Sequence, residues 1–247
     1  MEDWQNGGFG VYIHWPFCAA KCPYCDFNSH VRSAVDQPRW LSALKFELHN
    51  AAKRTNGRVV DTIFFGGGTP SLMDAETVAG LVAEVGKLWT LASNAEVTLE
   101  ANPTSVEARK FTDFGIAGVN RVSMGIQSLR DVDLKALGRM HSVSEAREAF
   151  EIAKDSFDRV SFDLIYARQG QSQGDWKAEL REAEAMAVDH LSLYQLTIEA
   201  GTRFGELFER GNLRGLPDDG LAADMYEATQ EFADTCDMPA YEVSNHA

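Results

Sequence analysis

The stretch HWPFCAAKCPYCDFNSH, from His14 to His30, holds three of the four cysteines of the chain. Cys18, Cys22 and Cys25 lie within eight residues, directly after an apolar run. Three thiolates at this spacing can hold one side of a small metal cluster, and Pro23 restricts the backbone within the turn. Because iron–sulfur clusters usually take four protein ligands, such a loop leaves one iron free for another ligand. The spacing therefore predicts cluster chemistry near the start of the chain.

A structural zinc site is the alternative interpretation of this loop, completed by Cys236 or by His14 or His30. Zinc sites usually join two-residue knuckles that lie far apart in sequence, so the compact triplet is poor geometry for zinc. The fourth cysteine, Cys236, follows a helical stretch near the other end of the chain, and we expect it to be a buried free thiol.

Length and composition limit the possible classes of protein. A chain of 247 residues with 45% hydrophobic and 24% charged residues fits one soluble domain, within the size range of α/β barrels. We find no apolar run long enough to span a bilayer and no signal peptide, and we expect a cytoplasmic protein. The formal charge of −14 argues against a nucleic-acid partner, because phosphate binding needs clustered Lys and Arg.

Short β-rich runs alternate with helical periods along the whole chain. The predicted strands are Phe9–His14, Val60–Phe65, Glu96–Glu100, Val119–Met124, Arg159–Ile165 and His190–Leu196. The predicted helices include Arg39–Lys53, Asp74–Leu88, Val106–Phe114, Ser144–Lys154 and Asp175–Ala187, with capping-box patterns at Thr104/Glu107 and Ser142/Glu145. This alternation predicts a parallel α/β sheet, either an incomplete barrel or a doubly wound sheet.

Polar residues and glycines repeatedly follow the apolar part of a predicted strand. They include Gly66–Thr69, Glu100–Pro103, Gly125–Gln127, Asp163 and Tyr194–Gln195. Ligands of parallel α/β sheets bind where the carboxyl ends of the strands meet. We therefore expect these residues to share one rim.

The motif CxxxCxxC, with Tyr24 before its last cysteine, resembles the signature of radical S-adenosylmethionine (SAM) enzymes. The stretches IFFGGGTPSL, EANP, GVNRVSMGIQS, LKALGRMHS, SFDLIY, HLSLYQLTIEAGTRF and YEVSNHA are similar, in order, to the oxygen-independent coproporphyrinogen III oxidase-like family, and most to its heme chaperone branch. The resemblance implies a partial (β/α)6 radical-SAM-type barrel over residues 1–247. It also implies a [4Fe-4S] cluster on Cys18, Cys22 and Cys25, with SAM at the fourth iron.

The same resemblance assigns the SAM-binding residues. Gly67, Gly68 and Thr69 would contact the methionyl end of SAM, and Arg139 would pair with its carboxylate. The other expected residues of the SAM site are Tyr12, Tyr24, Glu100, Gln127 and Asp163, with Tyr24 beside the adenine or the cluster. From the residues alone, the glycines could form a simple turn, Glu100 could be an exposed strand end, and Tyr12 could be an inward-facing aromatic.

Two histidines of the matched motifs have no settled role from the sequence. His14 fits a core position and a functional one equally well. For His141, in GRMHS, we expect an interaction whose partner the sequence does not identify.

Two departures distinguish the chain from the oxidase branch of the family. Asp26-Phe27 stands where the oxidases carry a further cysteine, and only 17 residues precede Cys18. Both favour a heme chaperone, with heme as cargo, heme-acceptor proteins at the membrane as partners, and a homodimer as one candidate assembly. Oxidative decarboxylation of coproporphyrinogen III is the alternative, so whether the chain is an enzyme stays open.

Two further features concern the extent of the chain and one loop. Relatives continue past YEVSNHA into a C-terminal domain with a heme-associated motif, so we expect a fragment that lacks this domain. The segment ARQGQS, Ala167–Ser172, stands where many relatives have Gly-Leu-Pro-Gly-Gln, and we expect a conserved turn with an altered rim.

Overall fold

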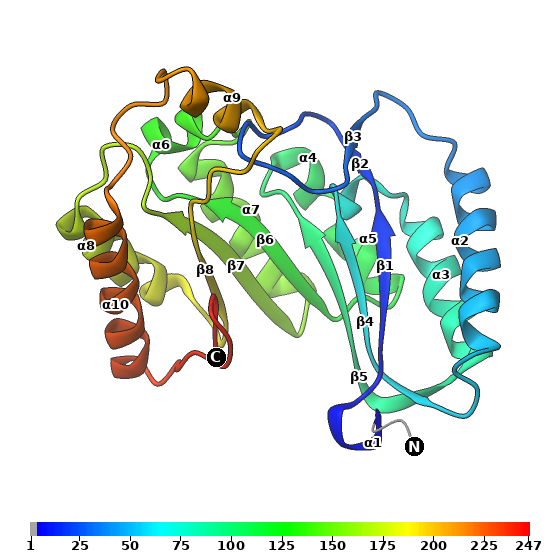
Figure 1. Cartoon of the computed structure of the whole chain (residues 1–247). Helices are drawn as coiled ribbons and strands as arrows, with labels where there is room; N and C mark the ends of the chain where they lie inside the picture. Colours follow the sequence, from blue (N-terminus) through cyan, green and yellow to red (C-terminus); the bar gives the residue numbers. More distant parts are fainter. Residues whose placement is uncertain (1–3) are drawn as a thin grey trace.

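The computed structural model describes residues 4–247 and shows a strongly curled sheet with helices on its outer side (Figure 1). Seven strands lie in the order β1-β4-β5-β6-β7-β8-β9, and all neighbours are parallel except β8 and β9. The strands are β1 Gly10–Trp15, β4 Val59–Gly67, β5 Thr90–Ala101, β6 Arg121–Gln127, β7 Arg159–Tyr166, β8 Leu191–Gln195 and β9 Asn245–His246. The six parallel strands confirm the predicted partial (β/α)6 barrel, and the one-sided helices exclude a doubly wound sheet.

Most of the helices connect successive strands and pack against the convex face of the sheet (Figure 1). They are α1 Trp4–Gly7, α2 Gln37–Ala52, α3 Ala75–Leu88, α4 Ser105–Ala108, α5 Phe111–Ile116, α6 Asp131–Ala136, α7 Val143–Ser156, α8 Gln173–Met186, α9 Arg203–Glu209 and α10 Asp219–Thr235, with a 3-10 turn at Pro70–Leu72. Among residues 4–247, no helix combines the length and the apolar character needed to cross a bilayer.

Two local expectations are corrected by the structure. The predicted helix over Val106–Phe114 is divided into α4 and α5, which meet at Lys110; its ammonium donates to the carbonyl of Ser71 at 3.3 Å and ties this point to the turn after β4. Cys236 is a free cysteine as expected, but it is half-buried rather than buried. It lies at the cap beyond the last turn of α10, where the chain leaves the packed face of the helix.

The two capping boxes predicted from the sequence differ in the structure. Ser142 and Glu145 form the predicted reciprocal capping box at the start of α7. Thr104 accepts a hydrogen bond from the amide of Glu107, but the Glu107 carboxylate turns away to accept from the amide of Asn102 at 2.9 Å. The Thr104 pattern is therefore only half of a capping box, and its glutamate ties the end of β5 to α4.

The two faces of the sheet differ in polarity. Along β6, Val122, Met124 and Ile126 are fully buried against the helices, while the residues between them are partly exposed on the concave face. Strand β7 repeats this pattern, with Phe162 and Leu164 buried and Asp163 between them. The apolar core therefore lies between sheet and helices, and the interior of the half-barrel is left to polar side chains.

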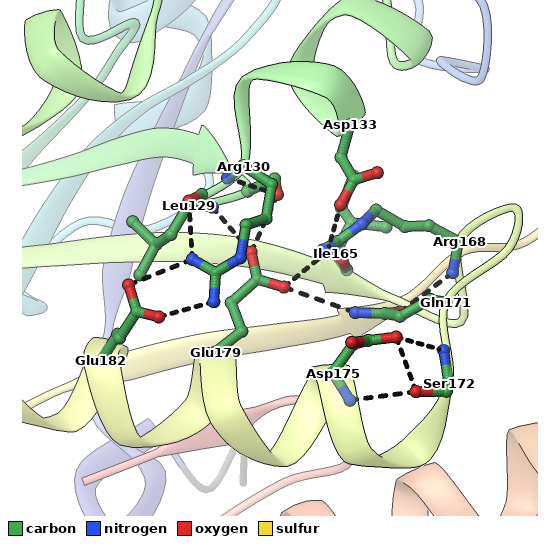
Figure 2. A network of polar contacts seen from close by, with 11 residues as sticks. Leu129, Arg130, Asp133, Ile165, Arg168, Gln171, Ser172, Asp175, Glu179 and Glu182 are labelled. Atoms are coloured by element: carbon green, nitrogen blue, oxygen red, sulfur yellow. Dashed lines mark hydrogen bonds and ion pairs between the residues drawn. The ribbon is translucent and has the colours of Figure 1, made fainter.

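A buried ionic network fixes the loop after β7, which carries the unusual ARQGQS segment (Figure 2). The Arg168 side chain, 4% exposed, donates to Asp133 of α6 at 2.8 Å and pairs with Glu179 of α8, which is 2% exposed. Glu179 also accepts from the Ser128 hydroxyl at 2.8 Å and the Leu129 amide at 2.6 Å. The network joins the ends of β6 and β7 to α6 and α8. Arg168 therefore holds the turn of the Ala167–Ser172 segment in place.

We expect Arg168→Met to lower the free energy of unfolding by about 3–5 kcal/mol, because it leaves the buried Glu179 carboxylate without its ionic partner. Urea unfolding followed by circular dichroism measures the change. Arg130→Met is the matched control. Arg130 makes a two-pronged pair with Glu182 in the same region, but both side chains are more than a third exposed (Figure 2). Loss of this exposed pair should lower the free energy of unfolding by no more than about 1 kcal/mol. An equal decrease for the two variants would contradict the importance of the buried pair.

Candidate functional site

The cysteine loop is closed at its base by a small two-stranded sheet. Strand β2, Phe17–Cys18, pairs in parallel with β3, His30–Val31, and the His30 amide donates to the Pro16 carbonyl at 2.7 Å. Within the loop, the Cys25 amide donates to the Cys22 carbonyl at 3.2 Å and forms a turn around Pro23. The loop therefore lies over the carboxyl-terminal rim of the sheet, as the sequence predicts (Figure 1).

The far side of the loop docks on two elements from the second half of the chain. The Phe204 amide of α9 donates to the Pro23 carbonyl at 2.8 Å, and the Phe204 ring lies 6.3 Å from that of Tyr24. Gly138 has a φ of +67°, and a Cβ there would lie 2.8 Å from Pro23 Cδ. Glycine is required at position 138 because the loop approaches the backbone so closely.

The three loop cysteines lie close enough for their charges to interact. Among residues 4–247, no three His, Cys, Asp or Glu side chains come together around one ion position, as a zinc site requires. A cluster instead takes each thiolate at a different iron. Burial raises the pKa of the Cys25 thiol, and Cys22 and Cys18 are close enough for their charges to raise it further. Cationic irons between these thiols would remove that repulsion.

The glycines at the end of β4 and just beyond it are needed for close packing within the protein. A Cβ on Gly67, where φ is +119°, would lie 2.6 Å from the His14 ring, and one on Gly68 would lie 2.7 Å from the Phe17 carbonyl oxygen. The Gly68 and Thr69 amides donate to the carbonyls of Trp15 at 2.7 Å and Phe17 at 2.8 Å. These amides are therefore occupied, and a ligand at this turn would meet carbonyl oxygens, which suit an ammonium group.

Arg139 connects the loop to the ends of β5 and β6. Its Nη1 donates to Cys22 Sγ at 3.3 Å, and its Nη2 donates to Asn102 Oδ1 at 2.6 Å and to the Gly125 carbonyl at 2.8 Å. Its Nε is buried and has no hydrogen-bond partner. An unpaired buried donor on a fixed guanidinium is a suitable contact for an anionic ligand group.

Gln127 ends β6 in a strained conformation. Its φ is +72°, which is uncommon outside glycine, and the register between β6 and β7 shifts at this point. The side-chain oxygen, Oε1, is buried without a hydrogen-bond partner. Backbone strain together with an unsatisfied acceptor is typical of a binding site.

Two carboxylates face the interior of the half-barrel. Glu100 on β5 accepts from the Gly67 amide at 3.1 Å, and Asp163 on β7 accepts from the Ser123 hydroxyl at 3.3 Å. Burial, with the neighbouring charge of Asp163, raises the pKa of Glu100 to about 7. Burial also raises the pKa of Asp163 to about 6. The pair favours a cationic or hydroxyl-bearing ligand that would restore the lost solvation.

Tyr12 and His14 connect β1 to the cysteine loop. Tyr12 stacks on Phe64 and places its hydroxyl 3.3 Å from His14 Nδ1, while His14 Nε2 lies 2.9 Å from the Asn28 carbonyl. His14 therefore holds the loop through its contact with the Asn28 backbone and does not belong to the apolar core. Tyr12 is 58% exposed, facing the interior rather than packing in the core.

Two further residues of the matched motifs lie close to these groups. His141 is buried, with Nε2 3.0 Å from the Ile126 carbonyl, and burial lowers its pKa to about 4, so it is a neutral structural anchor. Tyr24 lies at the cysteine loop against Phe204, where burial raises its pKa well above the usual value. The sequence placed Asn102 at the rim without a role, and it gave no signal for Ser123, whose hydroxyl donates to Asp163 at 3.3 Å.

A half-barrel whose rim carries a three-cysteine loop, a half-buried arginine and two half-buried carboxylates defines a radical-SAM-type protein. The sequence comparisons agree with this class. The Radical SAM superfamily matches residues 12–183, and the chain belongs to this superfamily.

Curated relatives and solved structures specify the similarity further. The chain is 40% identical over 238 residues to the bovine mitochondrial radical S-adenosyl methionine domain-containing protein 1, and 40% identical over 239 residues to the Escherichia coli heme chaperone HemW. These matches cover 96% of the chain but only 54% and 62% of the two relatives. The E. coli coproporphyrinogen III oxidase HemN has the same fold, with a TM-score of 0.81 at 22% identity over 96% of the chain and 55% of that structure.

We expect the stability of the cluster-free chain to fall as the pH rises from about 4.5 towards about 7 through Glu100. A carboxyl whose pKa is higher in the folded chain binds more protons folded than unfolded, so raising the pH favours unfolding. Glu100→Gln should reduce this slope to the part that Asp163 contributes, and gain on the order of 1–2 kcal/mol relative to the unchanged chain between pH 5 and pH 8. Urea midpoints measured across this range test the expectation.

Glu145→Gln is the contrasting control for this pH series. The Ser142 backbone and hydroxyl lower the pKa of Glu145, so its contribution to stability is lost only as the pH falls through the acidic range. This variant should change the slope at low pH and leave the slope near neutrality as it was. The same neutral slope with and without Glu100 would contradict the burial of its charge.

Proposed function

We propose that the chain binds a [4Fe-4S] cluster and SAM and, with them, carries heme for delivery to acceptor proteins. The observation that carries the proposal is the three-cysteine loop held over a polar half-barrel by Arg139, which bonds one cysteine directly. The 40% identity to HemW over 96% of the chain supports the heme-carrying part. The chain spans about half to three-fifths of the length of these relatives. The activity of a whole relative is therefore a proposal for this chain.

Each cofactor group has a matching set of residues. Cys18, Cys22 and Cys25 would hold three irons, and SAM at the remaining iron supplies a sulfonium that one-electron reduction can cleave. The free Nε of Arg139 suits the carboxylate of SAM, and Glu100 suits its ammonium or ribose hydroxyls. Gln127 and Asp163 supply further acceptors on the same interior face.

The alternative function is oxygen-independent oxidation of coproporphyrinogen III. The likeness to HemN shows the fold alone at 22% identity. The loop after Cys25 favours the chaperone, because Asp26 and Phe27 replace a further thiol and the Phe27 side chain is 60% exposed. An apolar ring displayed beside the cluster fits contact with a porphyrin plane better than it fits an additional metal ligand.

Substitution of any loop cysteine should abolish cluster binding. After anaerobic reconstitution with iron and sulfide, Cys18→Ala, Cys22→Ala and Cys25→Ala should each lose the brown chromophore and most of the roughly four irons expected per chain, because two thiolates cannot hold the cluster against solvent. Absorbance and iron analysis measure the loss.

The fourth cysteine provides the control for this series. Cys236→Ala should keep the full iron content, since Cys236 lies beyond α10, at the end of the chain's long final helix. Loss of the cluster in this variant would show that the ligand assignment is wrong. A chain without any chromophore after reconstitution would remove the basis for the whole proposal.

Heme transfer and porphyrinogen oxidation give opposite outcomes in one assay. The reconstituted chain is offered heme and an apo-acceptor protein in one arm, and coproporphyrinogen III with SAM and a reductant in the other. We expect a heme absorbance spectrum and transfer to the acceptor, with no protoporphyrinogen above the level of a Cys22→Ala control. Protoporphyrinogen formation that depends on SAM would replace the chaperone proposal with the oxidase alternative.

A further inference from the structure

The three cysteines of the loop differ in the groups that contact their sulfur atoms. Cys22 Sγ accepts from Arg139 Nη1 at 3.3 Å, and the charge of the same cysteine acts on the nearby Tyr24 hydroxyl. For Cys25, the nearby donor is the backbone amide of Phe27. A cationic side-chain donor is thus directed at Cys22, with a tyrosine hydroxyl close to it.

Arg139 is held in place independently of any cofactor. Its Nη2 is fixed by Asn102 Oδ1 and the Gly125 carbonyl, and its backbone amide donates to the Leu134 carbonyl of α6 at 2.8 Å. Asn102 is in turn bonded through its own amide to the buried Glu107. Because its backbone and its Nη2 are fixed, Arg139 presents Nη1 to Cys22 without having to rearrange.

We propose that Arg139 raises the reduction potential of the cluster through its hydrogen bond to the Cys22 sulfur, and that the neighbouring Tyr24 hydroxyl acts in the same direction. The potential of an iron–sulfur cluster depends on hydrogen bonds to its sulfurs and on nearby charge. Reduction adds one negative charge, which is shared by the thiolate ligands. Donors at a thiolate therefore stabilise the reduced cluster more than the oxidised one, and a buried cation adds to this effect.

This inference rests on the proposed cluster but adds a second role to a residue expected to bind SAM. Arg139 would be both a contact for the SAM carboxylate, through its free Nε, and a positioning and tuning residue for the cluster through Nη1. Binding of SAM at this guanidinium would then change the reduction potential of the cluster. By thermodynamic linkage, reduction of the cluster would change the affinity for SAM by the same factor.

The test is a mediated redox titration of the reconstituted full chain, followed by the electron paramagnetic resonance signal of the reduced cluster. Compared with the unchanged chain, Arg139→Gln should lower the ratio of reduced to oxidised cluster at a fixed potential by about tenfold, which is about 59 mV for a one-electron couple. Tyr24→Phe removes only a hydroxyl and should lower the ratio by about threefold in the same direction.

Lys21→Gln is the matched control, because it removes one positive charge within the same loop. Lys21 is exposed, and its charge acts on Cys25 only through space, so water and salt screen it. This variant should change the ratio by less than twofold. A change as large as that of Arg139→Gln would show that charge alone sets the potential and would overturn the role of the hydrogen bonds.

The outcomes separate this inference from the proposed function. An unchanged chain that takes up no cluster contradicts the proposed function. Variants at Arg139 and Tyr24 that keep four irons and titrate at the original potential contradict the inference alone. If Arg139→Gln fails to retain the cluster, Tyr24→Phe decides, since its ring can still pack on Phe204.

Discussion

The close approach of the segment after β1 to the glycine turn after β4 is the constraint on which the rest of the site depends. The Gly68 and Thr69 amides bond to the backbone of Trp15 and Phe17, and the missing side chains at 67 and 68 leave room for the His14 ring and the Phe17 backbone. This contact sets the position of Cys18, the first residue of the loop to face the rim. Any side chain at these glycines would push the loop away from the sheet.

The polarity of the concave face follows from the same half-barrel geometry. Because the sheet does not close, its interior cannot be filled by apolar layers as in a complete barrel, and charged groups there must pair or remain hydrated. At the amino-terminal end of the strands they do pair: Glu96 accepts from Arg121 at 3.0 Å and from Arg159 at 2.8 Å, and Arg159 also bonds Asp189 at 2.7 Å. At the opposite end, no ion pair with Glu100 or Asp163 occurs among residues 4–247, and the pKa values of both carboxyls are raised. The chain thus neutralises the carboxylates at one end internally, while those at the other end have no cationic partner within the described residues.

The sequence predicted the fold well because its signals are local. Alternation along β6 and β7 and the strand-end positions of Glu100 and Asp163 are sufficient to place these residues at one rim of a parallel sheet. Contacts between distant segments have no such local signal. Nothing near Pro23 indicates that Phe204 and Gly138 dock on it, and the reason for Gly67 is a histidine 53 residues earlier in the chain. Similarly, Glu107 has the spacing of a capping box but bonds Asn102, because a buried strand end competes for its carboxylate.

Arg168 shows how a departure in sequence can preserve a site. At a position where many relatives are expected to have leucine, a buried arginine is tolerable only if acidic partners surround it, and Asp133 and Glu179 provide them. Asp133 lies in α6, and its carbonyl accepts from the amide of Leu137 at 2.8 Å, two residues before Arg139. The ionic network therefore reaches the backbone that carries the guanidinium at Cys22. Because a guanidinium directs its donors only as accurately as its backbone is held, the altered loop after β7 is structurally connected to Cys22 of the cysteine loop.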